Sequence, residues 1–342
     1  MPVSFEGLAY ERILFKPVDN CEDGGLHADV YLPTEKKNGY TSWPVAMAIH
    51  GGGFCLGDTK HIFVGHFEYL LEQGFCVVVV EYRLAPHAHQ KEQREDWVDA
   101  YKWITSPKGL NAALGSKGQV DRERVFVCGA SAGGVACWFL TIDLLAAKLP
   151  LPKALYVIYP VTDLNLQLPN PPVTPQPFSK FPELVKQLSE KEQQQIKELF
   201  EGPIGTGFSL RGEFDRPVHP RRVWFDFAAS NGMLVPQWVD EFPPPYSPEK
   251  NMITQFSSDF PPTVLIKAMA DKLVPTEHTQ SAYDKLTELG VETKLFEARG
   301  MEHGDVEETT RILQRWGREL AHVWWEEAYK PATDFCIAKC RA

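Results

Sequence analysis

Short apolar runs alternate along the chain with longer stretches whose apolar residues recur at helical spacing. The runs at 45–49 and 76–80 are apolar throughout and contain β-branched residues, which is typical of buried strands. Between such runs, residues 92–104 carry apolar side chains three and four positions apart, and this pattern predicts a helix with one face packed on a sheet. Strands that alternate with helices favour a mostly parallel sheet with helices on both faces.

The same pattern continues toward both ends of the chain. Residues 10–18 and 26–32 flank a turn-rich loop and predict an opening antiparallel hairpin. Residues 276–289 predict a late helix that ends at Gly290. Further strands are predicted at residues 124–128, 154–159, 264–268 and 293–296, and further helices at residues 66–73 and from residue 134 onward.

The alternation breaks between residues 164 and 262, a stretch rich in proline and aromatic residues. Residues 183–199 within it are highly charged and have the pattern of a helix. So long an interruption, with a helix of its own, predicts a cap inserted at 165–255 into a single domain of residues 1–342. Most aromatic side chains of the insertion are expected to form the core of the cap, and some to line a pocket: Phe178, Phe181, Phe200, Phe208, Phe214, Trp224, Phe225, Phe227 and Trp238.

The sequence Gly129-Ala130-Ser131-Ala132-Gly133 places a serine between a predicted strand and a predicted helix. It fits the pattern G-x-S-x-G, which is common by chance in glycine-rich loops but gains weight in this strand-turn-helix context. The flanking glycines Gly129 and Gly133 allow a sharp turn, so that the Ser131 hydroxyl stands exposed above the sheet. We therefore predict that Ser131 is a nucleophile.

A second glycine-rich motif, His50-Gly51-Gly52-Gly53, follows the predicted strand 45–49. Residues without side chains let backbone N–H groups approach a developing negative charge, which suits an oxyanion hole. We predict that Gly52 and Gly53 donate there together with the N–H of Ala132, and that His50 braces the loop beside Gly51. A phosphate-binding loop is disfavoured, because the chain contains no G-x-x-x-x-G-K-[ST] pattern.

Three motifs occur in a fixed order: His50-Gly51-Gly52-Gly53-Phe54, Glu81-Tyr82-Arg83-Leu84-Ala85-Pro86 and Gly129-Ala130-Ser131-Ala132-Gly133-Gly134. Together they resemble the hormone-sensitive-lipase-like branch of the α/β-hydrolases, the HGGG esterases. The resemblance implies an α/β-hydrolase fold, with a mostly parallel eight-stranded sheet, helices on both faces and a helical cap joined by residues 1–9. Two positions depart from the family pattern: Ala130 stands where an acidic residue is usual, and Glu81 where aspartate is usual.

The resemblance also implies a catalytic triad in the order serine, acid, histidine. Asp271 lies in the loop after the predicted strand 264–268, at the strand end where α/β sheets keep their sites. His303 lies in the loop after the predicted strand 293–296. We predict that His303 is the general base for Ser131 and that Asp271 orients it. Glu302 and Asp305 are the competing acids, but each is too near His303 in sequence to brace it from the far side.

The predicted function is that of a serine carboxylesterase that forms an acyl-enzyme on Ser131. A thioesterase, lactonase, cyclase or acyltransferase of specialised metabolism would use the same triad and oxyanion hole, so the sequence leaves these alternatives open. The departure at Ala130 and the aromatic-rich cap favour a specialised substrate. A non-catalytic small-molecule receptor is the third alternative, but it predicts the loss of a triad member, and Ser131, Asp271 and His303 are all present.

Composition narrows the class of partner. A formal charge of −10 over 342 residues argues against nucleic acid or an anionic membrane, and the longest apolar strand is too short to span a bilayer. We expect a small-molecule ester, thioester or lactone as substrate, with no cofactor and no metal, since His87-x-His89 lacks further ligands at suitable spacing. Seven cysteines without a C-x-x-C pattern indicate a reducing compartment, and we expect a cytoplasmic location.

Overall fold

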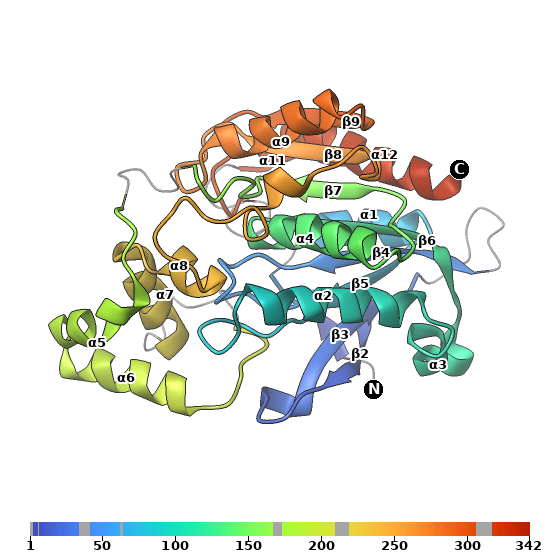
Figure 1. The fold of residues 1–342 in the computed structure, drawn as a ribbon. Coiled ribbons are helices and arrows are strands. Elements are labelled where there is room, and N and C mark those ends of the chain that lie inside the picture. The colour runs from blue at the N-terminus through green and yellow to red at the C-terminus, as the bar shows by residue number, and fades with distance from the viewer. Residues whose placement is uncertain are drawn as a thin grey trace.

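The computed structural model describes residues 3–5, 7–33, 42–61, 64–166, 173–208, 219–305 and 317–342. Within these residues the strands form one sheet in the order β1-β2-β3-β5-β4-β6-β7-β8-β9 (Figure 1). The strands are β1 (Val3–Phe5), β2 (Leu8–Pro17), β3 (Gly25–Tyr31), β4 (Trp43–Ile49), β5 (Cys76–Val80), β6 (Val120–Ala130), β7 (Leu155–Ile158), β8 (Thr263–Ala268) and β9 (Thr293–Ala298).

Strand pairing agrees with the predicted architecture. Strands β5, β4, β6, β7, β8 and β9 pair in parallel, and β2 and β3 form the predicted antiparallel hairpin at one side. Strands β2 to β9 are therefore the predicted eight-stranded, mostly parallel sheet. The short β1 is an addition that pairs antiparallel with β2.

The position of β1 corrects the expectation that residues 1–9 join the cap. Val3–Phe5 pair with residues 8–10 of β2, so this part of the segment extends the sheet. The reason is local, because Gly7 adopts a φ of +87° and turns the chain back on itself between the two strands. Met1, Pro2 and Glu6 lie outside the described residues.

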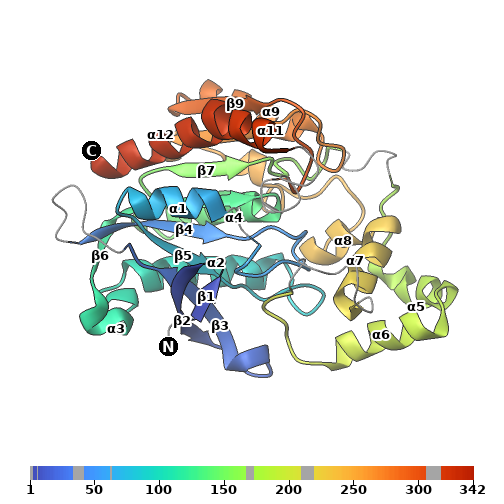
Figure 2. The ribbon, with the colours of Figure 1, turned by 180° about the vertical axis from the view of Figure 1, so that it is seen from behind.

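Helices cover both faces of the sheet, as Figures 1 and 2 show from opposite sides. Trp97 of α2 and Trp138 of α4 are completely buried in the apolar cluster on one face. Phe67 of α1 and Tyr329 pack in the cluster on the other face. The covering helices are α1 (Val64–Glu72), α2 (Gln90–Thr105), α3 (Leu110–Leu114), α4 (Ala132–Ala146), α9 (Thr276–Glu288), α11 (Gly317–Trp324) and α12 (Lys330–Arg341), with a π-helical turn at Trp325–Tyr329 before α12.

Four of the described α-helices form a cap beyond the carboxyl ends of the parallel strands, on the left in Figure 1. They are α5 (Phe181–Leu184), α6 (Glu190–Glu201), α7 (Pro220–Ser230) and α8 (Leu234–Val239). The cap packs around the fully buried Trp224 in an apolar cluster that also includes Cys55, Leu56 and Ala85. By contrast, Trp238 and Val239 of α8 pack into the main cluster with α2 and α4, so the cap is continuous with the core.

The prediction of one helix over residues 183–199 is wrong. The chain ends α5 at Leu184 and begins α6 at Glu190. Ser189 causes this division, because its hydroxyl accepts a hydrogen bond from the N–H of Glu192 while the Glu192 carboxylate accepts from the N–H of Ser189. This capping box stabilises a helix start at a position that periodicity alone does not reveal.

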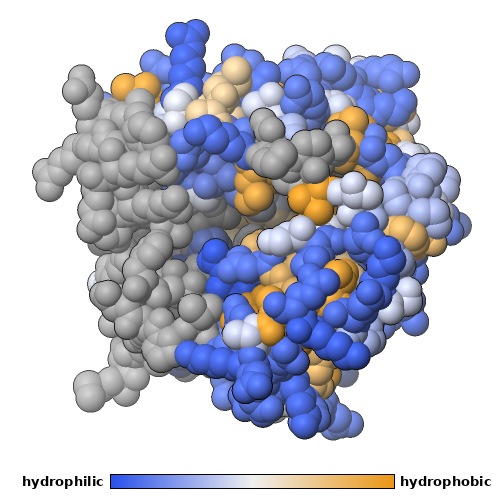
Figure 3. All heavy atoms as spheres, turned by 90° about the vertical axis from the view of Figure 1, so that its left-hand side faces the viewer, coloured by the Kyte–Doolittle hydropathy of each residue, from blue (hydrophilic) through white to orange (hydrophobic). Residues whose placement is uncertain are grey.

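The face that carries the cap is shown from outside in Figure 3. Apolar side chains emerge there within a mainly hydrophilic surface. Exposed large apolar residues on the cap and on the loops at this end of the sheet include Phe178, Phe200, Met269 and Leu273. Phe214, one of the aromatic residues assigned to the cap, lies outside the described residues.

All seven cysteines are free, and five of them are buried. Cys128, at the end of β6, is partly exposed. A buried thiol behaves as a small apolar group, and burial raises the pKa of Cys55 to about 12. Among the described helices, none combines the length and apolar character needed to cross a membrane.

One buried histidine makes the stability of the fold depend on pH. His66 of α1 lies against Tyr156, whose hydroxyl is 3.1 Å from its Nε2. Burial lowers the pKa of His66 to about 3, whereas an unfolded histidine titrates near 6.5. Between these values the unfolded chain binds the extra proton, so the stabilisation by neutral His66 is present above pH 6.5 and is lost as pH falls toward 3.

We therefore expect His66→Gln, which keeps a hydrogen-bond acceptor for Tyr156, to lose less stability than the wild type between pH 7 and pH 4.5. The measurement is the urea midpoint of each protein at both pH values. Carboxylates titrate equally in both proteins, so the difference between the two slopes reports His66. Parallel slopes would show that His66 does not carry this dependence.

Candidate active site

Ser131 stands at the sharp turn between β6 and α4, with φ of +55° and ψ of −121°. A residue with a side chain rarely adopts this conformation, and it persists only where the surroundings enforce it. The flanking glycines are required by close approach. A Cβ on Gly133 would lie 2.1 Å from the carbonyl oxygen of Ile49, and one on Gly129 would lie 2.2 Å from that of Gly133. The predicted strand-turn-helix context is thus present.

A chain of two hydrogen bonds links the predicted triad residues. His303 Nε2 is 2.8 Å from Ser131 Oγ, and His303 Nδ1 is 2.7 Å from Asp271 Oδ2. The side chain of Asp271 is only 1% exposed and that of His303 12% exposed. A carboxylate only accepts, so Nδ1 carries the proton and the Nε2 lone pair is directed at the Ser131 hydroxyl.

Strand register explains why Asp271 and His303 meet although 32 residues separate them. Ala268 ends β8 opposite Ala298 at the end of β9, so the two following loops leave the sheet side by side. Two backbone bonds hold these loops together, from Met269 N–H to Ala298 O at 3.1 Å and from Ala270 N–H to Met301 O at 2.8 Å. The second oxygen of Asp271 accepts the N–H groups of Leu273 and Val274 at 2.9 and 2.8 Å.

Three aromatic residues that the sequence analysis did not assign to the site support the loop of His303. The ring of Tyr159, which follows β7, packs 4.6 Å from the His303 ring. Trp324 donates its indole N–H to the carbonyl of Arg299 at 2.8 Å, and the Tyr329 hydroxyl lies 3.1 Å from the sulfur of Met301. Trp324, directly before the π-helical turn, and Tyr329, at the end of that turn, thus hold the loop that carries His303.

The glycine-rich loop lies beside Ser131 because β4 and β6 are neighbours in register. Ile49, at the end of β4, is opposite Gly129 of β6. Gly52 and Gly53 adopt φ of +107° and +58°, and a Cβ on Gly52 would lie 2.1 Å from the carbonyl oxygen of Leu56. Ala132 begins α4, so its N–H belongs to the first turn, where donors lack intrahelical acceptors and the helix dipole favours negative charge.

His50 holds the start of this loop. Its Nδ1 donates to the carbonyl of Gly51 at 2.8 Å, and its ring stacks on Tyr82 with 4.4 Å between ring centres. Tyr82 in turn donates its hydroxyl to the carbonyl of His50 at 3.2 Å. Burial lowers the pKa of His50, so the ring is neutral and its other nitrogen carries no proton. These contacts fit the bracing role predicted for His50.

The structure shows what surrounds Ala130 and Glu81, the two residues that depart from the family pattern. Ala130 and His50 border a cavity of about 60 Å³ whose lining is mainly apolar, and Nε2 of His50 is buried without a hydrogen-bond partner among the described residues. Glu81 is buried, accepts the N–H of His27 at 2.8 Å and pairs with Arg12 at 2.6 Å, so its longer side chain anchors the edge of the sheet.

The cap is fastened to the loop after β5 through backbone carbonyls. Arg221 at the start of α7 donates to the carbonyl of Ala85 at 2.8 Å, and Gln237 of α8 donates to that of Pro86 at 3.2 Å. Burial lowers the pKa of Arg221, and a Cβ on Gly205 would fall 2.0 Å from the guanidinium. Gly205 is therefore the residue that leaves room for this buried side chain.

The alternative site residues make other contacts. Glu302 is 3.6 Å from Lys272, and Asp305 accepts the N–H of Glu302 at 2.8 Å. His89 of the His87-x-His89 pair lies 2.7 Å from the carbonyl oxygen of Gln237 in the cap. None of these three contacts involves the Ser131–His303–Asp271 chain.

Comparison with known proteins identifies a described family for part of this chain. Residues 46–189 match the family described as alpha/beta hydrolase fold, and this range contains the glycine-rich loop and the turn with Ser131. The chain has the α/β-hydrolase fold. The match supports the family predicted from the three motifs, and the sheet and its covering helices have the expected architecture.

The regions that match this chain in its sequence relatives are parts of much longer proteins. Non-reducing polyketide synthase Preu6 of Preussia isomera is 27% identical over 326 residues, which are 91% of this chain and 14% of the synthase. Methylphloroacetophenone synthase of Cladonia uncialis is 29% identical over 160 residues, which are 46% of this chain and 6% of the synthase. The chain therefore spans 14% or less of the length of these relatives.

Solved structures share the fold over nearly the whole chain. Carboxyl esterase 2 of Tuber melanosporum has a TM-score of 0.57 and 20% identity, with 98% of this chain and 89% of that chain covered. The Pyrobaculum calidifontis esterase has a TM-score of 0.58 and 22% identity, with coverages of 97% and 84%. At this level of identity the likeness shows a common fold.

The geometry leads to a test of Asp271. In Asp271→Asn the amide oxygen can still accept the N–H groups of Leu273 and Val274, while the amide nitrogen faces His303 and favours the tautomer with the proton on Nε2. That tautomer cannot accept the Ser131 proton, so we expect kcat for an ester to fall on the order of 10⁴-fold with little change in the melting temperature.

Glu302→Gln is the matched control, since it removes a carboxylate that is adjacent to His303 in sequence and lies 3.6 Å from Lys272. We expect its kcat to remain within a few-fold of the wild type. If Glu302→Gln lost the activity and Asp271→Asn kept it, the assignment of the acid would be reversed.

Proposed function

We propose that this α/β-hydrolase cleaves carboxylic esters or thioesters by forming an acyl-enzyme on Ser131. The observation that carries the proposal is the unbroken hydrogen-bonded chain from Ser131 Oγ through His303 to the buried Asp271. The glycine-rich loop beside it adds backbone donors in the place where a carbonyl oxygen would become negative. Nucleophile, base, orienting acid and oxyanion donors are thus within one site.

The proposed reaction proceeds in two halves. Ser131 Oγ attacks the substrate carbonyl carbon while His303 Nε2 takes its proton, and the carbonyl oxygen becomes an oxyanion held by the N–H groups of Gly52, Gly53 and Ala132. Collapse expels the alcohol or thiol, which takes the proton from His303. Water then attacks the acyl-enzyme with His303 again as base, and the acid leaves as Ser131 regains its proton.

A specialised acyl substrate is the second candidate, supported by the relatives. The polyketide synthase similarity extends over 91% of this chain and so includes the cap as well as the sheet. The cap is rich in aromatic side chains, and the Phe225 ring reaches within 2.6 Å of the position that a Cβ on Gly53 would occupy. We propose that an aromatic or polyketide acyl group, delivered as a thioester or ester, is bound between the cap and this loop.

The experiment that tests the proposed function compares wild type with Ser131→Ala on p-nitrophenyl esters from acetate to octanoate. Removing the nucleophile should leave the melting temperature nearly unchanged and reduce kcat on the order of 10³-fold or more. Equal turnover by the two proteins would refute Ser131 chemistry. Absence of turnover in both, together with failure of a fluorophosphonate to label Ser131, would favour a receptor.

The substrate class is tested with N-acetylcysteamine thioesters of octanoate and of a hydroxylated benzoate. If the acyl site accepts an aromatic polyketide-like group, kcat/KM for the aryl thioester should exceed that for the octanoyl thioester by about tenfold or more, which corresponds to about 1.4 kcal/mol of transition-state binding. A clear preference for octanoate would identify a general fatty-acyl esterase instead.

A further inference from the structure

The loop that carries the proposed oxyanion donors has an unusual backbone at Phe54. Gly52, Gly53 and Phe54 adopt positive φ values in succession, of 107°, 58° and 67°. For glycine this costs nothing in steric terms, but a phenylalanine rarely adopts such a conformation unless its surroundings enforce it. Because Gly53 directly precedes Phe54, the contacts that keep Phe54 in this conformation also influence the position of Gly53.

Gln93 of α2 is the side chain that holds it. Its amide nitrogen donates to the carbonyl of Phe54 at 3.0 Å and to that of Arg83 at 2.8 Å, and its amide oxygen accepts the indole N–H of Trp238 at 2.8 Å. Carbonyls only accept and an indole N–H only donates, so a single orientation of the amide satisfies all three partners. Gln93 is 0% exposed, so losing these bonds would leave buried polar groups without partners.

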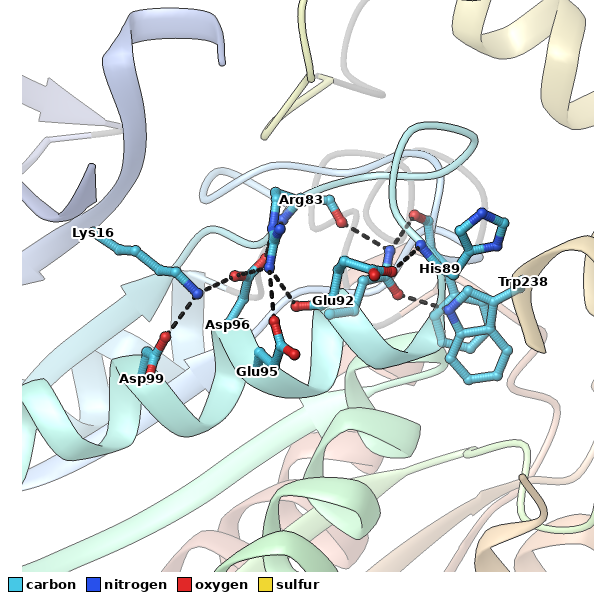
Figure 4. Close-up of polar contacts among 10 residues, drawn as sticks. Lys16, Arg83, His89, Glu92, Glu95, Asp96, Asp99 and Trp238 are labelled. Carbon is cyan, nitrogen blue, oxygen red and sulfur yellow. Dashed lines mark hydrogen bonds and ion pairs between the residues drawn. The ribbon is translucent and has the colours of Figure 1, made fainter. Parts of the chain in front are cut away.

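The helix that carries Gln93 is itself held firmly. One turn later, Asp96 accepts Nε and Nη2 of Arg83 at 2.8 Å each and the ammonium group of Lys16 at 2.7 Å. Figure 4 shows Asp96 on α2 with Arg83 and Lys16 directed toward it. Because these contacts hold α2 in place, the Gln93 side chain bonds its partners from a fixed position.

The cap contacts the same two loop residues directly. The ring of Trp238 stacks on that of Phe54 with 3.7 Å between ring centres and 8° between planes. The ring of Phe225 lies so near Gly53 that a Cβ there would be 2.6 Å from it. Trp238 is thus hydrogen-bonded to Gln93 and stacked on Phe54, whose carbonyl Gln93 also binds. We call this set of contacts among Gln93, Trp238 and Phe54 the fastening, because it joins the cap to the loop.

We propose that Gln93 is a positioning residue for the oxyanion loop, and that its bond to Trp238 makes the placement of the Gly52 and Gly53 donors depend on the cap. The inference rests on the proposed function of this loop. It predicts that weakening the fastening impairs stabilisation of the transition state even for a substrate too small to reach the cap. A fastening that merely holds the cap in place would change KM for large substrates and leave a small one unaffected.

The test is Gln93→Glu, which preserves shape but replaces the donor to two carbonyls by an oxygen. With p-nitrophenyl acetate we expect kcat to fall by about 10- to 100-fold with KM within about threefold, because a small displacement of oxyanion donors costs that much. Gln90→Glu is the matched control: Gln90 is 1% exposed, lies one turn earlier on α2, and donates to the carbonyl of Lys250 instead. Its kcat should stay within about twofold.

Amide hydrogen exchange gives a readout that does not depend on activity. The N–H of Leu56 bonds to Gly52 O at 2.8 Å and that of Ala85 to Phe54 O at 2.9 Å, so both report on the loop. In Gln93→Glu both should exchange about tenfold faster or more, while the amides of β8 are unchanged. Unchanged exchange at Leu56 and Ala85 would overturn the inference, even if the wild type proved inactive on esters and the proposed function failed separately.

Trp238→Phe serves where Gln93→Glu does not fold, because it keeps an aromatic ring beside Phe54 while it removes the indole N–H together with part of the bicyclic ring. A smaller change in the same direction, in both kcat and exchange at Leu56, supports the inference. An equal loss of kcat in Gln90→Glu, or a change confined to KM, would show that the fastening is only structural.

Discussion

The close approach of the turn after β6 to the carboxyl end of β4 is the constraint on which the site depends. Ile49 and Gly129 are paired in the sheet, and the Ile49 carbonyl occupies the space that any side chain at position 133 would need. This contact places Ser131 and the glycine-rich loop on the same edge. The loops of Asp271 and His303 reach that edge from the far side of β7, so their geometry is useful only because the turn is held there.

Much of this arrangement could be predicted from the sequence, because it follows from local patterns and from the rules of parallel sheets. Apolar runs indicate the strands, and the ends of parallel strands converge on one edge. A serine, an aspartate and a histidine that each follow such a strand are therefore brought near one another. The glycines at 129 and 133 were predictable for the same reason, since a strand that turns directly into a helix leaves no room for side chains.

The rest depends on contacts between residues that are distant in sequence. Gln93 lies four positions before Trp97 on the buried face of α2, and a polar residue at an apolar position of that face was the available signal. Nothing local indicates that its partners are Phe54, Arg83 and Trp238, which come from three other segments. The contacts of Trp324 and Tyr329 with the His303 loop could not be predicted either, because buried tryptophan and tyrosine side chains in a helix usually serve only to pack the core.

The way in which the cap is attached has a consequence for how the molecule can change over evolution. Arg221 and Gln237 are bonded to the backbone carbonyls of Ala85 and Pro86, and every residue type offers such a carbonyl. These two bonds therefore do not depend on which side chains the receiving loop carries, while the donors in the cap must be retained. A cap that retains Arg221 and Gln237 can therefore change its other side chains while it stays attached to the same sheet.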